Sequence, residues 1–187
     1  MTAANMVDAA VFSPDVSIGR IHVADLLGNG TYNSGCIGED DTLGGFGSVI
    51  RGLIIKGTRT APSDPTMAFP YTNQVAHELV AEALSPDLAQ NITERLLLEE
   101  GLCQNEPPTH WVYGKTTTLR LAPDVTASWM GMYVGTLNTT GTAPAGKEPC
   151  GGVAVLHSGT HYGLLDIEFC LGTAEMNRVV RAALSRL

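Results

Sequence analysis

The chain has little positive charge, and its few cations are scattered. It carries 11 lysines and arginines against 19 acidic residues in a length of 187, a formal net charge of −8. The lysines are Lys56, Lys115 and Lys147, and no basic stripe joins them to the arginines. A protein that follows nucleic-acid phosphates concentrates such residues on one face. The composition therefore argues against nucleic acid as a partner.

Long apolar runs are also missing. No segment approaches the roughly 18 to 20 consecutive apolar residues that a membrane-spanning helix needs. The first residues, 1–5, lack the basic region that opens a secretory signal peptide. From the sequence as written, we expect no membrane span and a cytoplasmic protein.

The four cysteines do not form a metal motif. Cys36, Cys103, Cys150 and Cys170 lie far apart, with no Cys-x-x-Cys pair and no histidine at zinc-finger spacing. We therefore predict no structural metal and no cofactor, and we favour buried free thiols over disulfides. Cys36 would become a reactive thiol only if a histidine approached it, which the sequence does not show.

What the sequence does contain is enough apolar residues, 44% of the chain, to build one core. We expect a single domain over residues 1–187, with a helical start within residues 1–30 and a long Gly-rich loop over residues 31–48. A strand follows at residues 49–56, and prolines 62, 65 and 70 then break regular structure.

Two helices are predicted before the middle of the chain. Residues 74–84 show apolar side chains at helical spacing. Directly after them, Ser85 is a suitable N-cap, Pro86 suits the first helical position, and Gly101 is expected to end the second helix in a left-handed conformation. Leu88, Ile92 and Leu96 form the apolar stripe of this second helix.

From His110 onward the apolar pattern changes to a period of two, which predicts strands at residues 111–121, 127–137, 153–157 and 162–169. A closing helix from Thr173 has one apolar face, made of Met176, Val179, Val180, Ala183, Leu184 and Leu187. The sequence thus predicts an α+β fold. Its antiparallel sheet comes mainly from the C-terminal half, with helices from the N-terminal half and the C-terminal helix packed on it.

One stretch has residue types suited to binding an anion. Lys115 is followed by Thr116, Thr117 and Thr118 on one predicted strand, and Trp129 lies on the next. An ammonium beside hydroxyl groups on an edge strand can bind a carboxylate, while the strand backbone pairs with an extended peptide. We take Lys115, Thr116, Thr118 and Trp129 as the candidate ligand-binding residues.

This order of elements resembles the C-terminal part of the penicillin-binding transpeptidase and serine β-lactamase domains. In that family a Lys-Ser/Thr-Gly strand, preceded by glycine, is followed by an antiparallel strand with Trp and Gly. Here the segment from Gly114 to Thr118 resembles the first strand, Ser128 to Gly135 resembles the second, and Ser17 to Leu27 resembles a helix before an Asn-Gly turn. The resemblance covers residues 17–140, and it implies a location in the cell envelope.

The chain departs from that family at its catalytic motifs. The third motif position is Thr117, where a glycine would allow a ligand backbone to come close. The residues three places before the lysines are Leu53, Val112 and Pro144, so no Ser-x-x-Lys pair exists, and Ser-x-Asn is absent too. The resemblance therefore implies a degenerate or truncated relative that binds a peptide-like or carboxylate ligand without acylation.

Two further hypotheses stay open. His157 and His161, with Asp166 and Glu168 on the next strand, are weak candidates for metal ligands, although histidines four apart more often cap a hairpin. The alternative function is a structural or assembly module, a homo-oligomer or part of a complex with another protein. In that case apolar residues such as Met130, Met132 and Tyr133 would contact another chain.

Overall fold

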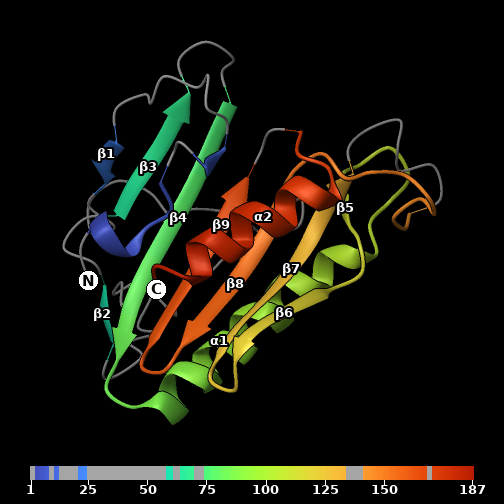
Figure 1. Cartoon of the computed structure of the whole chain (residues 1–187). Helices are drawn as coiled ribbons and strands as arrows, with labels where there is room; N and C mark the ends of the chain where they lie inside the picture. The colour runs from blue at the N-terminus through green and yellow to red at the C-terminus, as the bar shows by residue number, and fades with distance from the viewer. Residues whose placement is uncertain are drawn as a thin grey trace.

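The computed structural model describes residues 3–8, 11–12, 21–24, 58–60, 64–69, 74–133, 141–167 and 170–187. Within them the protein is an α+β fold, in which one antiparallel sheet carries a helix on each face (Figure 1). The helices are α1 (Pro86–Gly101) and α2 (Thr173–Leu184), with short 3-10 helices η1 (Ala3–Asn5) and η4 (Leu102–Gln104). The strands are β1 (Ile21–Ala24), β2 (Thr58–Thr60), β3 (Asp64–Phe69), β4 (Gln74–Ala83), β5 (Val112–Tyr113), β6 (Thr117–Ala122), β7 (Val125–Tyr133), β8 (Gly152–Ser158) and β9 (His161–Ile167).

The sheet has the order β1-β3-β4-β9-β8-β7-β5, with β2 paired to β4 and β6 paired to β7. Strands β5 and β6 follow one another along β7 and together form one edge of the sheet. Helix α2 packs against β7 and β8 on one face, and α1 packs against β8, β9 and β4 on the other. We call these two sides the α2 face and the α1 face. The predicted fold class is confirmed.

The elements of the C-terminal half follow their sequence pattern closely. All four predicted strands are present, with the first divided into β5 and β6. The predicted apolar face of the last helix is buried in every member: Met176, Val179, Val180, Ala183, Leu184 and Leu187. These side chains join Trp129 and Leu165 in the core of the α2 face. A second core, on the α1 face, contains Ile92, Met130 and Tyr162.

Helix α1 begins where its N-cap was predicted. The Ser85 hydroxyl accepts a hydrogen bond from the backbone N–H of Leu88 at 3.2 Å, which satisfies one of the free N–H groups of the first turn. The left-handed stop predicted for Gly101 is wrong. Gly101 has φ −63° and ψ −20°, ordinary helical values, and the chain continues into η4.

The helix predicted over residues 74–84 is also wrong, because this segment is strand β4. Ala76, Glu78 and Val80 are buried on the α2 face, while Ala81 and Ala83 are buried on the α1 face. A strand covered on both faces has apolar residues at nearly every position, and such a run also satisfies a helical template. Pairing with β3 on one side and β9 on the other decides the outcome.

Some other predictions for the N-terminal half are wrong, and others concern residues that the structure does not describe. The predicted helical start amounts to η1, and the segment Ile21–Ala24 is strand β1, not the helix that the transpeptidase resemblance implied. Pro65 does not break regular structure, since it lies in β3 opposite Val23 of β1. The predicted loop at residues 31–48 and strand at residues 49–56 lie outside the described residues, as do prolines 62 and 70.

The prediction of free thiols is wrong. Cys150 and Cys170 form a disulfide, with their Cα atoms 3.7 Å apart, and Cys103 is also disulfide-bonded. Cys150 precedes β8 and Cys170 follows β9, so their bond closes the open end of this hairpin. Since the pairing depends on the register of the two strands, wide spacing in the sequence did not reveal it.

Removing this bond should cost substantial stability. The two cysteines are 20 residues apart, and closing a loop of that length stabilises a fold by about 3 kcal/mol. In a domain of this size we expect the double variant Cys150→Ser/Cys170→Ser to unfold about 6 to 12 °C lower. Thermal unfolding followed by circular dichroism measures the shift, and an unchanged midpoint would contradict the expectation.

Candidate functional site

Lys115 lies at the sheet edge, in the irregular connection between β5 and β6. Both strands pair with β7, and the backbone N–H of Gly114 donates to the Gly131 carbonyl at 2.8 Å. The Gln104 amide donates to the Gly114 carbonyl at 2.7 Å and to the Thr116 hydroxyl at 3.3 Å. These bonds tether the connection on both sides of Lys115, whose own side chain is exposed.

A cavity of about 370 Å³ opens beside Lys115 on the α2 face. Alternate residues of β7 form one wall, because side chains two apart in a strand share a face. The lining residues are Gly114, Lys115, Thr117, Trp129, Gly131, Tyr133, Ala143, Pro144, Ala145, Pro149 and Thr173. We call this cavity the Lys115 pocket. It combines one cation with two aromatic rings and two prolines.

Gly131 allows the loop after residue 141 to reach this wall. A Cβ atom at Gly131 would lie 2.5 Å from the Cβ of Pro149, closer than such atoms approach in proteins. Pro149 can therefore lie against β7 only because position 131 lacks a side chain. The strand that supplies Trp129 and Tyr133 thus leaves room between them for the opposite wall.

The charged and ionisable groups near the pocket have defined states. The carboxylate of Glu148 accepts a hydrogen bond from the Thr173 backbone N–H at 2.6 Å at the start of α2, and this bond lowers the pKa of Glu148. Burial, and then the Glu148 charge, raise the pKa of Tyr133, whose hydroxyl donates to the Lys147 carbonyl at 3.2 Å. At neutral pH the pocket wall therefore offers a neutral phenol, and among the described residues Lys115 forms no ion pair.

The structure brings together two of the four predicted ligand-binding residues. Lys115 and Trp129 both line the pocket, whereas Thr116 and Thr118 do not. The Thr118 and Ser128 hydroxyls lie 3.1 Å apart on the α1 face. Thr117, which the sequence analysis regarded as an obstruction, lines the pocket instead.

Sequence reasoning missed Thr117, Tyr133, Pro149 and Thr173. The alternation of side chains along a strand could have found two of them, since Thr117 shares a face with position 115 and Tyr133 with Trp129. Pro149 and Thr173 come from a loop and from a helix start, and no local pattern connects these elements to β7.

The two weak metal candidates lie on opposite faces of the sheet. In the β8–β9 register His157 is opposite Tyr162 and Ser158 is opposite His161, so the imidazoles project to different sides. The His161 Nδ1 lies 2.7 Å from the Leu187 carbonyl oxygen. Asp166 shares the α1 face with His157, while Glu168 lies outside the described side chains. Across the described residues no three His, Cys, Asp or Glu side chains gather in a metal-binding group.

The residues named for the assembly alternative are less exposed than expected. Met130 is fully buried in the α1-face core, and Met132 and Tyr133 are partly buried. Among the side chains that the structure describes, the large apolar ones that are exposed are Leu84, Leu98, Leu102 and Leu121. Within the described parts of the chain, no helix is long and apolar enough to cross a membrane.

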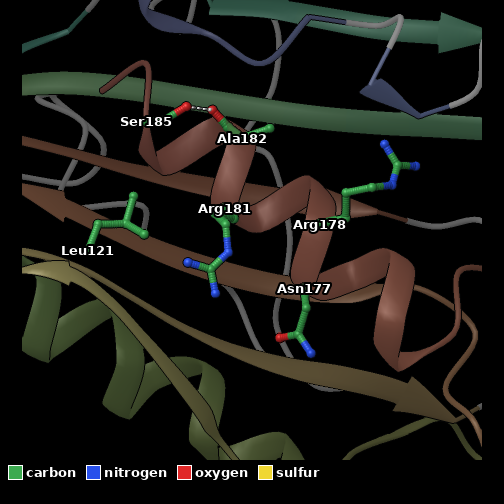
Figure 2. A pocket seen from close by; sticks show the side chains of 6 residues that line it. All are labelled: Leu121, Asn177, Arg178, Arg181, Ala182 and Ser185. Atoms are coloured by element: carbon green, nitrogen blue, oxygen red, sulfur yellow. Dashed lines mark hydrogen bonds between the residues drawn. The ribbon is translucent and has the colours of Figure 1, made fainter.

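A second, more open cavity of about 630 Å³ lies further along the same face (Figure 2). It is lined by Leu121 of β6 and by Asn177, Arg178, Arg181, Ala182 and Ser185 of α2 and its C-terminal end. Figure 2 shows Asn177 and Arg181 pointing from α2 toward the side where Leu121 lies, whereas Arg178 points away. We call this cavity the Arg181 groove.

Comparison with known proteins gives no assignment. No protein-family model matches the chain, and neither does any curated protein. Among solved structures, the extracellular domain of PknH from Mycobacterium tuberculosis is similar with a TM-score of 0.42 and 8% identity, over 66% of this chain and 62% of that one. Similarity at this level carries no argument, so we transfer neither fold nor function from it.

Proposed function

We propose that this protein binds a small carboxylate-bearing ligand without covalent chemistry, in the Lys115 pocket. The observation that carries the proposal is the meeting of two aromatic side chains with an ammonium that forms no ion pair within the described parts of the chain, around a cavity of about 370 Å³. Small-molecule sites are typically concave and mostly apolar, with few polar groups that fix orientation. The Lys115 pocket has this composition.

Each group has a definite part in the proposed complex. The Lys115 ammonium holds the carboxylate, and the Thr117 hydroxyl donates a hydrogen bond to it or to a neighbouring carbonyl. Trp129 and Tyr133 contact the apolar part of the ligand. The sequence resemblance to the Lys-Ser/Thr-Gly strand of transpeptidases also favours a carboxylate, and a peptide-like one.

Binding without acylation is favoured by what lines the pocket. Its described lining contains no serine, cysteine, histidine, aspartate or glutamate. An activated nucleophile needs a base within hydrogen-bond reach, and among the described residues no hydrogen bond joins the Thr117 hydroxyl to a basic side chain. The disulfides support an oxidising setting for the protein, such as the cell envelope, because cytosolic thiols are kept reduced.

The proposal predicts that Lys115→Gln weakens binding of carboxylates selectively. N-acetyl-phenylalanine, titrated by calorimetry, should bind the variant about tenfold more weakly, since a hydrogen bond to a charged group contributes on the order of 1.5 kcal/mol. The neutral amide of the same compound should bind both proteins equally. Lys147→Gln is the matched control, because Lys147 is also exposed on the adjoining loop but does not line the pocket. Equal affinity of wild type and Lys115→Gln for the acid would refute the proposal.

A further inference from the structure

The Lys115 pocket and the Arg181 groove adjoin one another along strand β6. Trp129 lines the first and Asn177 the second, and the Trp129 indole N–H donates to the Asn177 amide oxygen at 3.0 Å. From β6, Thr117 lines the first cavity and Leu121 the second, while Leu119 between them packs on the core of the α2 face. The two cavities are therefore successive parts of one surface between α2 and the sheet edge.

Each end of this surface carries a cation that forms no ion pair among the described residues. Lys115 is at one end and Arg181 at the other, and both side chains are exposed. The neighbouring Arg178 is engaged, because it pairs with Glu175 and donates to the Val11 carbonyl. Two exposed cations on one face of a chain with a net charge of −8 favour an anionic occupant.

The sheet edge itself favours a peptide. Among the described strands β6 pairs with β7 alone, so its outer edge has no strand partner. Gln104 occupies the edge at Gly114, before β6 begins. An extended peptide can add to such an edge through its backbone, with alternate side chains directed to one face.

We infer that the ligand is an extended acidic peptide lying along β6, with one carboxylate at Lys115 and a second at Arg181. This inference rests on the proposed function and adds the ligand's length and charge pattern. At about 3.3 Å per residue, the six steps from position 115 to position 121 span about 20 Å, so the two acids should lie six positions apart in the peptide, at i and i+6. A difference of six positions places both carboxylates on the α2 face, whereas a difference of five or seven positions places them on opposite faces of the peptide strand.

Synthetic peptides with blocked ends test this geometry. Each is Thr- and Ser-rich and carries either one glutamate or two glutamates that lie five, six or seven positions apart. Fluorescence anisotropy with labelled peptides should give about tenfold tighter binding for the separation of six than for one glutamate, and little gain for five or seven. The tenfold gain corresponds to about 1.4 kcal/mol.

Substitutions show which side chain causes the tighter binding of the two-glutamate peptide. Arg181→Gln should abolish the advantage of the second glutamate, so that the peptide with glutamates six positions apart binds no more tightly than the single-glutamate peptide. Arg178→Gln is the matched control, since this side chain comes from the same helix but pairs with Glu175 and points away from the side where Leu121 lies. Lys115→Gln should weaken every peptide.

The outcomes separate this inference from the proposed function. If the single-glutamate peptide binds through Lys115 but the second acid adds nothing at any separation, the inference is wrong and the proposed function stands. If no peptide and no small carboxylate depends on Lys115, both fail. Arg181-dependent binding of dodecanoate that is not displaced by the peptide with glutamates six positions apart would identify an anionic amphiphile as the occupant and overturn the inference.

Discussion

Replacing Glu78 with glutamine should make the free energy of unfolding much less dependent on pH between pH 4.5 and pH 8, and should leave the variant more stable than the wild type at pH 8. Glu78 lies on β4 with 0% of its surface exposed. Burial raises its pKa from 4.5 to about 8, against smaller opposing effects of a hydrogen bond from Val7 and the charge of Arg186. The neutral carboxyl is therefore the form that the folded protein prefers.

The direction of the pH effect follows from this shift. In the unfolded chain Glu78 loses its proton near pH 4.5, while the folded protein keeps it until about pH 8. Between these values the folded state binds more protons, so the free energy of unfolding falls as pH rises, by about 1.4 kcal/mol per pH unit. The contribution is fully present below pH 4.5 and is lost by about pH 8, a total on the order of 5 kcal/mol.

Contacts around Glu78 explain why the group matters to the fold. Its Oε2 accepts a hydrogen bond from the Val7 backbone N–H at 2.6 Å, and its Oε1 is buried without a partner among the described residues. Arg186 donates to the Met6 carbonyl at 2.8 Å and lies 3.6 Å from Asp8. The N-terminal segment is thus held between β4 and the end of the chain. The cost of ionising Glu78 comes from its burial, which the Val7 hydrogen bond and the Arg186 charge offset only in part.

Urea unfolding at several pH values measures the effect. Glu78→Gln has no proton to lose, so its stability should change much less between pH 5 and pH 8, and at pH 8 it should exceed that of the wild type. Glu82→Gln, at a partly buried position on the same strand, is the matched control and should keep the wild-type slope. Parallel pH profiles for wild type and Glu78→Gln would refute this account.

Gly152→Ala is expected to be the most damaging small substitution in the sheet. Gly152 has φ +148°, a conformation that side chains rarely allow, and a Cβ there would lie 2.2 Å from the Met130 carbonyl oxygen. That oxygen belongs to the neighbouring strand β7, so relief requires the two strands to move apart. Strain and the lost pairing together should cost at least about 4 kcal/mol.

Gly101→Ala provides the contrasting control. Gly101 has ordinary helical angles at the end of α1, and no atom lies within 4 Å of its added Cβ. Alanine there should be neutral or stabilise the protein by up to about 1 kcal/mol, because the unfolded chain loses conformational freedom. Urea midpoints measure both variants. A Gly152→Ala protein within 1 kcal/mol of wild type would show that the strands accommodate the methyl group.

Local sequence signals correctly predicted the elements whose apolar spacing fits only one type of secondary structure. The buried face of α2 and the Ser85 cap of α1 were both found from spacing alone. Strand β4 was not, since apolar residues on both of its faces fit a helix equally well and only its neighbours β3 and β9 decide. The buried Glu78 in that strand would have been placed on the exposed side of a helix.

The candidate site shows the same division. The sequence placed Lys115 and Trp129 on adjacent extended segments, because alternating residues and a short connection require it. Only the tertiary structure decided which threonine faces the cavity, that Pro149 and Thr173 close it, and that Cys150 joins Cys170. Residue types and local periodicity can be read from the sequence and determine the local elements. The distances between residues on remote segments depend on strand register and packing, which only the tertiary structure shows.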